Sequence, residues 1–156
     1  MIRVVLTVAV AVALIAASMP ALETARVTTT AERLDGEADR IERSTARVVS
    51  GSVAVADPSL AARTSTVVRV PTGITAARIS WIALVEIGGA GADPAIALRY
   101  RTAGGRDRII AVRTAAVPAR VELATGQIDL RPSGESRIEL RYVDDGGPTV
   151  RIARVG

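Results

Sequence analysis

The stretch VVLTVAVAVALIAASMPAL, from Val4 to Leu22, contains nineteen consecutive residues without a charge, and Arg3 stands directly before it. A helix of this length spans about 28 Å at 1.5 Å per residue, close to the ~30 Å hydrocarbon core of a bilayer. No charged side chain enters the lipid, where each would cost about 2.5–3.5 kcal/mol on insertion scales. The sequence therefore predicts a membrane anchor over residues 1–22, which contacts the lipid bilayer through Val4–Leu22.

A cleaved secretory signal peptide is the alternative interpretation of the same residues. A basic start, an apolar stretch and small residues at 16–18 are the parts of such a signal. The apolar run continues beyond them through Ala21 and Leu22, which favours a retained anchor. The N-terminal amine and Arg3 favour the cytoplasmic side. We therefore expect a single-pass protein of the cell membrane, with a cytoplasmic N-terminus and residues 23–156 outside.

The pattern of residues 23–50 predicts an amphipathic stem helix. Apolar and small residues recur there at alternating steps of four and three, namely Val27, Ala31, Leu34, Ala38, Ile41, Thr45 and Val48. Charged residues lie between them, and Asp39 and Arg43 have the spacing of a favourable helical ion pair. Gly36 weakens the middle by about 1 kcal/mol relative to alanine, and the threonines at 28–30 are suited to start a new helix. Because alanine makes the stripe thin, we expect it to lie on the protein's own head more readily than on a second copy.

After Ser50 the apolar period changes from 3.6 to 2, which predicts a β-rich head over residues 51–156. Nine short strands are expected, at residues 52–56, 64–70, 78–86, 95–101, 108–113, 120–123, 127–130, 136–143 and 149–155. The last six are expected to form three hairpins in chain order. Residues 78–86 form the longest apolar segment, which predicts a central strand covered on both faces. The head is therefore predicted to be a mainly antiparallel sandwich or partly open barrel.

Composition narrows the functions that the chain can perform. The 156 residues include no cysteine, no histidine and only three aromatic residues, and the formal net charge is +4. The common general base, the thiolate nucleophile and most zinc sites are therefore absent. Few aromatic platforms remain for stacking nucleic-acid bases. We expect no enzyme activity, and assign no catalytic, cofactor-binding or metal-ligating residue, no small-molecule cofactor and no nucleic-acid partner.

Three sequence patterns are similar to known ligand-binding motifs. The glycine run at 88–91 lacks the Gly-Lys-Ser/Thr of a phosphate-binding loop, and the sequence Asp144-Asp145-Gly146-Gly147 lacks the spaced donors of a calcium loop. We interpret them as a surface loop and a hairpin turn. Arginines also recur along the strands: Arg69, Arg99, Arg101, Arg108, Arg113, Arg137, Arg141, Arg151 and Arg154. They are typical of an exposed sheet face, and contact with anionic lipid or an acidic partner is the alternative.

Three segments carry a resemblance to a known family: MIRVVLTVAVAVALIAASMPALE at 1–23, VVRVPTGITAARISWIAL at 67–84 and IELRYVDDGGPTVRIARVG at 138–156. They resemble short uncharacterised haloarchaeal single-pass membrane proteins that are found beside type IV pilus assembly components. The resemblance implies an accessory or structural protein of the cell envelope, in a pilus-like or secretion assembly, with envelope protein partners. The alternatives are an extracytoplasmic module that binds a surface glycan or anionic lipid, and an envelope hydrolase that uses two carboxylates.

Overall fold

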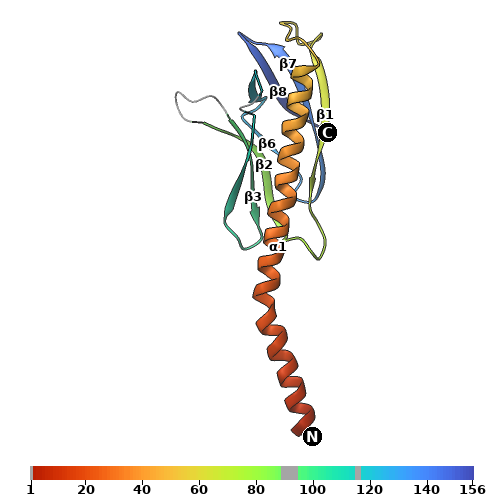
Figure 1. The fold of residues 1–156 in the computed structure, drawn as a ribbon, viewed down its shortest axis with the longest axis vertical. Helices are drawn as coiled ribbons and strands as arrows, with labels where there is room; N and C mark the ends of the chain where they lie inside the picture. Colours follow the sequence, from red (N-terminus) through yellow and green to blue (C-terminus); the bar gives the residue numbers. More distant parts are fainter. Residues whose placement is uncertain (1, 89–94, 115–116) are drawn as a thin grey trace.

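The first element of the chain is a single long helix. The computed structural model describes residues 2–88, 95–114 and 117–156. Helix α1 runs from Ile2 to Ser50 without interruption, with Pro20 inside it (Figure 1). The threonines expected to start a new helix instead bond back into this one, since the Thr28 and Thr30 hydroxyls donate to carbonyls one turn earlier at 3.0 and 2.8 Å. The predicted anchor and stem are therefore consecutive parts of one helix.

The described part of the head forms two four-stranded sheets, which confirms the predicted β fold as an open sandwich. Sheet A has the order β1-β7-β8-β5, with β1 at Ala62–Val70, β7 at Gly134–Asp144, β8 at Pro148–Val155 and β5 at Arg120–Leu123. Sheet B has the order β4-β3-β2-β6, with β4 at Asp107–Val112, β3 at Ala95–Thr102, β2 at Ile79–Ile87 and β6 at Gln127–Asp129. Every pairing is antiparallel except that of β5 with β8.

The predicted strand at residues 52–56 does not form. Only Val55 pairs, in an isolated parallel bridge with Val143. The register explains this, because β1 already covers β7 from Tyr142 downward and leaves only its last two residues free on that side. An alternating sequence supplies the side chains of a strand, but it cannot supply a neighbour to pair with.

Two of the three predicted hairpins are confirmed and one is wrong. Strands β3 and β4 pair with each other, and so do β7 and β8. The stretches at 120–123 and 127–130 do not: β5 joins β8 in sheet A and β6 joins β2 in sheet B. The chain changes sheets at residues 124–126, where Glu86 accepts the Leu123 N–H at 2.6 Å. This arrangement buries Val121, Leu123 and Ile128 in the shared core.

Strand β2 is central in sheet B, as predicted, between β3 and β6. Its inner face is fully covered, since Ile82 and Leu84 are 0% exposed. Its outer face carries the half-buried side chains of Trp81 and Val85. The prediction that both faces are covered therefore holds only for the inner face, because a sandwich buries one face of each sheet.

The second half of α1 completes the core of the head. It contacts β1 and β7 of sheet A together with β4 and β3 of sheet B, so it closes the side of the sandwich where β1 and β4 are the edges. Its buried residues are Thr30, Leu34, Glu37, Ala38, Ile41, Ser44, Thr45 and Val48. The predicted stripe is thus confirmed from Leu34 to Val48, and it lies on the protein's own head.

Polar side chains of α1 bond to the free edge of β1. Glu37 accepts the backbone N–H of Arg69 at 3.0 Å, and Arg40 donates to the Val67 carbonyl at 3.4 Å and pairs with Glu37 at 3.1 Å. Below β1, the Thr30 hydroxyl accepts the Ala77 N–H at 2.8 Å. The ion pairs along Ile2–Ser50 are therefore Glu23–Arg26 and Glu37–Arg40, and the predicted Asp39–Arg43 pair does not form. These bonds occupy a strand edge that would otherwise be open to another strand.

The stripe on α1 predicts a large loss of stability for Leu34→Asp. The substitution removes a fully buried apolar side chain and places an unpaired charge in the core, so the free energy of unfolding should fall by at least about 4 kcal/mol. Denaturation of the full chain in detergent, followed by the fluorescence of Trp81, measures this loss. Ala46→Asp places the same charge on the exposed face of the helix and should change stability by less than about 1 kcal/mol. Equal effects of the two substitutions would show that the stripe does not hold the helix.

A second prediction concerns the bond between Glu37 and β1. Glu37→Ala leaves the Arg69 N–H without its acceptor and should lower the free energy of unfolding by about 1–3 kcal/mol. Glu37→Gln keeps an acceptor oxygen and should recover part of the loss, whereas Glu32→Ala on the exposed face should have little effect. The same denaturation experiment compares the three variants. A Gln variant as unstable as the Ala variant would contradict a role as hydrogen-bond acceptor.

Candidate functional site

The anchor half of α1 is the most distinctive feature of the molecular surface. Residues 2–25 of the helix are exposed, and α1 holds an apolar window with a mean hydropathy of 2.4 that is not buried in the head. The segment is long and apolar enough to cross a membrane, and a signal sequence has these same properties. In Figure 1 it extends from one end of the head as an isolated helix.

Three connections form the end of the head from which the anchor extends, and we call them the proximal loops: residues 71–78, 103–106 and 131–133. Two hydrogen bonds hold them in place. The Ala77 N–H donates to the Thr30 hydroxyl of α1 at 2.8 Å, and the Ala103 N–H donates to the Arg78 carbonyl at 2.7 Å. The first loop is therefore fixed to the helix on one side and to the β3–β4 turn on the other.

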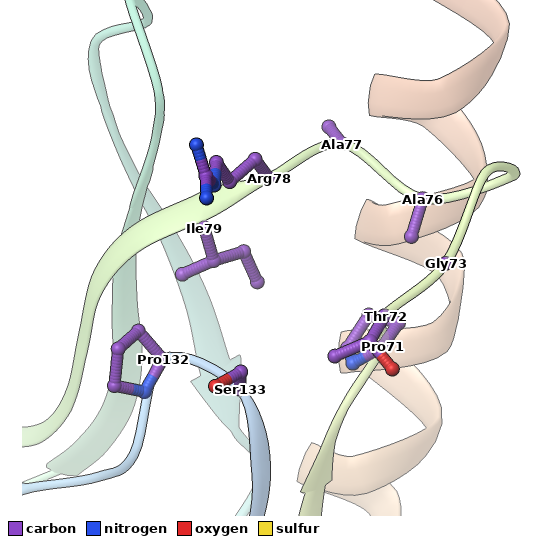
Figure 2. A pocket seen from close by; sticks show the side chains of 9 residues that line it. All are labelled: Pro71, Thr72, Gly73, Ala76, Ala77, Arg78, Ile79, Pro132 and Ser133. Carbon is purple, nitrogen blue, oxygen red and sulfur yellow. The ribbon is translucent and has the colours of Figure 1, made fainter.

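A pocket of about 460 Å³ opens between the first and third proximal loops. Its lining is Pro71, Thr72, Gly73, Ala76, Ala77, Arg78, Ile79, Pro132 and Ser133. Figure 2 shows Pro132 and Ser133 on one side and Pro71 and Thr72 on the other, with Ile79 between them and Arg78 beyond Ile79. Gly73 has a φ of 99°, a left-handed conformation that suits glycine at the start of this turn. The lining is mostly apolar, and Arg78 is its only charged residue.

The charges of the head are unequal between its two ends. The proximal loops contain Arg78, Arg106 and Arg131, all exposed, and no acidic residue. At the other end, loop 51–61 and the β7–β8 turn contain Asp57, Asp144 and Asp145, while Arg113 and Arg120 lie beside the end of β4 and the start of β5, and Arg151 pairs with Asp145 at 2.6 Å. Hydrogen bonds from Ser59 lower the pKa of Asp57 below its usual value, so this carboxyl stays ionised at neutral pH. The proximal loops are thus positive, whereas charges of both signs lie at the other end of the head.

An ion cluster lies on the outer face of sheet B. Asp107 accepts from Arg101 at 2.5 Å and from Arg99 at 2.6 Å, and the Arg99 guanidinium lies 5.8 Å from the ring centre of Trp81. The hydrogen bonds from Arg101 and Arg99 lower the pKa of Asp107, and the Asp107 bond in turn raises the pKa of Arg101. The Asp107 carboxylate is paired with both guanidiniums, so the cluster stabilises the β3–β4 hairpin. Asp107 is therefore not available as a catalytic carboxylate.

The other strand arginines do not combine into one basic face. Arg69 pairs with Glu135 at 2.8 Å and Arg151 with Asp145 at 2.6 Å, while Arg141 bonds to Glu139. These pairs are spread over sheet A and its turn, far along the chain from the cluster on sheet B. The interpretation of the arginines as an exposed, mixed-charge sheet surface is therefore confirmed for the paired residues.

The structure describes the Asp-Asp-Gly-Gly sequence completely and the glycine run only in part. Asp144-Asp145-Gly146-Gly147 forms the β7–β8 turn as predicted, with the Gly147 N–H donating to the Asp144 carboxylate at 2.9 Å. Of the glycine run, Gly88 follows β2, and its remainder lies outside the described residues. Over residues 2–88, 95–114 and 117–156, no three acidic side chains gather where they could hold a metal ion.

The fold and these sites define a class of protein: a β-sandwich head built around the continuation of an apolar, membrane-competent helix. The comparison with family models matches residues 1–155 to the family described as Domain of unknown function (DUF7311). The match covers nearly the whole chain, so the protein belongs to this family. Comparisons with curated proteins and with solved structures find no match.

The sequence did not indicate the pocket or the charge of the proximal loops. The periodicity places residues 71–73 after the predicted strand at 64–70 and residues 103–107 between the predicted strands at 95–101 and 108–113, and it indicates no site at either. A usable signal was present, because three loop segments each carry one arginine and no acid. Which loops share an end of the head follows from strand direction and pairing, which the sequence pattern does not fix.

The ion cluster on sheet B predicts a specific pH dependence. Because the folded-state pKa of Asp107 is lowered, its contribution to stability is present above the unfolded value of about 3.9 and is lost as pH falls through the folded value. Asp107→Asn should therefore lower the melting temperature at neutral pH, and the difference from the wild type should vanish in strong acid. Thermal melts across the acidic range measure it, with Asp35→Asn on the exposed helix face as the control. A difference that persists unchanged in strong acid would contradict the assignment.

Proposed function

We propose that this protein is a membrane-anchored accessory subunit of the cell envelope, which acts through protein contacts in a pilus-like or secretion assembly. Its N-terminus lies in the cytoplasm and its head lies outside. The observation that carries the proposal is the continuity of α1, which enters the head core at Thr30 and is buried there at Leu34 and Ile41. Because one helix serves both parts, the head cannot swing on a flexible linker and stands at a fixed height above the membrane. That geometry suits a rigid structural subunit.

The flanks of the apolar segment support this orientation. Arg3 and the N-terminal amine are positive on one side, whereas residues 23–40 on the other side carry acids and arginines together. Positive charge close to a spanning helix favours the cytoplasmic side. The resemblance of three segments to haloarchaeal proteins found beside type IV pilus components supports the assignment to a pilus-like assembly.

The end of the head farthest from the anchor offers a surface for a partner. We call loop 51–61, which follows α1 there, the distal tip (Figure 1). It exposes two large apolar side chains, Val53 at 81% and Leu60 at 75%. Two large apolar side chains this exposed in one short loop are available for contact with a protein partner. Asp57 lies between them in the sequence and remains charged. The distal tip therefore presents both apolar side chains and a negative charge.

The proposal assigns no catalytic step to the protein. The sequence lacks histidine and cysteine, and the acids of the sheet surfaces, Asp107, Glu135 and Glu139, are bonded to arginines. A carboxylate whose oxygens are occupied by a guanidinium is a poor general base, and at Asp107 the bonds from Arg101 and Arg99 also lower the pKa. The features that remain are shape, rigidity and contact surface.

Isolation of the tagged full-length protein from membranes in mild detergent tests this function. We expect envelope proteins of a pilus-like or secretion assembly to be enriched with the wild type, and their recovery to fall severalfold for the double variant Val53→Asp, Leu60→Asp, because the tip loses its apolar contact. Mass spectrometry of the recovered proteins measures both.

Ile109→Asp is the matched control, because it makes the same change at a side chain that is 58% exposed on the outer face of sheet B. It should leave recovery unchanged. Wild-type protein that enriches no envelope protein would contradict the proposed function, and equal losses for both variants would contradict the role of the tip.

A further inference from the structure

The proximal loops have a composition that differs from the rest of the head. They carry Arg78, Arg106 and Arg131 without any acid, and the first loop also presents Ile74, which is 86% exposed. An exposed isoleucine next to unpaired basic loops has no structural use within the head. Its position at the end that the anchor leaves points to something beneath it. We propose that the proximal loops bind anionic lipid headgroups of the membrane that holds the anchor, which seats the head on the bilayer surface. This inference rests on the retained anchor of the proposed function.

The length of α1 places these loops within reach of the membrane. Leu22 ends the apolar segment and Thr30 begins the contact with the head, so eight residues separate them and span about 12 Å. The headgroup layer accounts for about 5–8 Å of that distance. The first loop extends along α1 toward the anchor (Figure 1). Ile74 lies within the 73–76 turn, which the Ala76 N–H closes by donating to the Gly73 carbonyl at 3.2 Å, and this turn is the part of the loop that carries the exposed side chain toward the headgroup layer.

The charges of the nearby stem do not cancel those of the loops. Between residues 23 and 35, α1 has Glu23, Glu32 and Asp35 against Arg26 and Arg33, and Glu23 and Arg26 are 3.9 Å apart. This segment is nearly neutral, whereas the loops contribute three positive charges. At the distal end Asp57 and Asp144 are accompanied by Arg113 and Arg120, and Asp145 pairs with Arg151. That end lies about 30 Å further along α1, several Debye lengths from the surface, so an anionic membrane acts mainly on the proximal loops and attracts them.

The pocket gives this contact a defined geometry. Its apolar lining includes Pro71, Ile79 and Pro132, and in Figure 2 the Arg78 side chain lies beyond Ile79, at the edge of this lining and outside it. A phospholipid combines an anionic phosphate with apolar glycerol and acyl groups, which is the same pairing of chemistries. A guanidinium binds phosphate oxygens with two parallel hydrogen bonds. Arg78 thus meets the phosphate at the rim, while Arg106 and Arg131 contribute through their charge.

The absence of cysteine makes a direct test possible. A single Thr75→Cys substitution, adjacent to Ile74, is labelled with a polarity-sensitive fluorophore in the full-length protein, which is then placed in lipid nanodiscs. One set contains phosphatidylcholine only, and in the other about a third of the lipid is phosphatidylglycerol. We expect a blue-shifted, brighter emission in the anionic nanodiscs. High salt should abolish the difference, because the Debye length falls from about 10 Å at 0.1 M to about 3 Å at 1 M.

Substitution of the arginines measures their part in the effect. Each arginine near an anionic surface changes partitioning about five-fold, so Arg78→Gln with Arg106→Gln should lower the ratio of seated to free heads roughly 25-fold. Arg113→Gln, an exposed arginine at the other end of β4, should leave the emission unchanged. A fluorophore at Ser59→Cys on the distal tip should not respond to lipid charge. The melting temperature of each variant checks that the head remains folded.

The possible failures are distinguishable. Equal emission in the two kinds of nanodisc, or an equal loss with Arg113→Gln, would overturn the inference while the proposed function stands. Full-length protein that does not remain with nanodiscs during gel filtration would instead contradict the retained anchor, and with it the proposed function.

Discussion

The packing of α1 between the two sheets is the interaction on which the rest of the structure depends. Leu34 and Ile41 are completely buried there, between edge strands that belong to different sheets. Without them the sandwich would expose its core along one whole side, because β1 and β4 do not pair with each other. The same helix carries the apolar segment suited to the membrane. One continuous element therefore both completes the head core and carries the apolar segment.

The two open sides of the sandwich are bordered by different elements. On one side, the polar groups Thr30, Glu37 and Arg40 bond to the backbone of β1 and of the loop below it, while the apolar stripe fills the core. On the other side, β5 and β6 extend the two sheets from one continuous stretch of chain. The edge of β1 is thereby covered and cannot recruit another strand, whereas β5 and β6 are the outer strands of their sheets on the other side.

The long axis of the molecule also orders its surface chemistry. Apolar residues cover the anchor half of α1, arginines follow at the proximal loops, mixed ion pairs cover the sheets, and acids with exposed apolar side chains lie at the distal tip. Because α1 runs through all of these levels as one rigid element, each level has a fixed height. The fold thus converts a linear order of sequence segments into an order of distances from the apolar segment of α1.

The sequence by itself determined the features that depend on local pattern. An uncharged run marks Val4–Leu22, a step of four and three marks the stripe from Leu34 to Val48, and an Asp-Asp-Gly-Gly turn marks the β7–β8 hairpin. Only the tertiary structure decided the partners of β5 and β6, the burial of Glu37 and the grouping of Arg78, Arg106 and Arg131. These depend on contacts between distant segments: Glu37 is buried because Arg69, 32 residues later, offers it an unpaired N–H. Local periodicity records which face of an element is apolar, but not which other element will cover it.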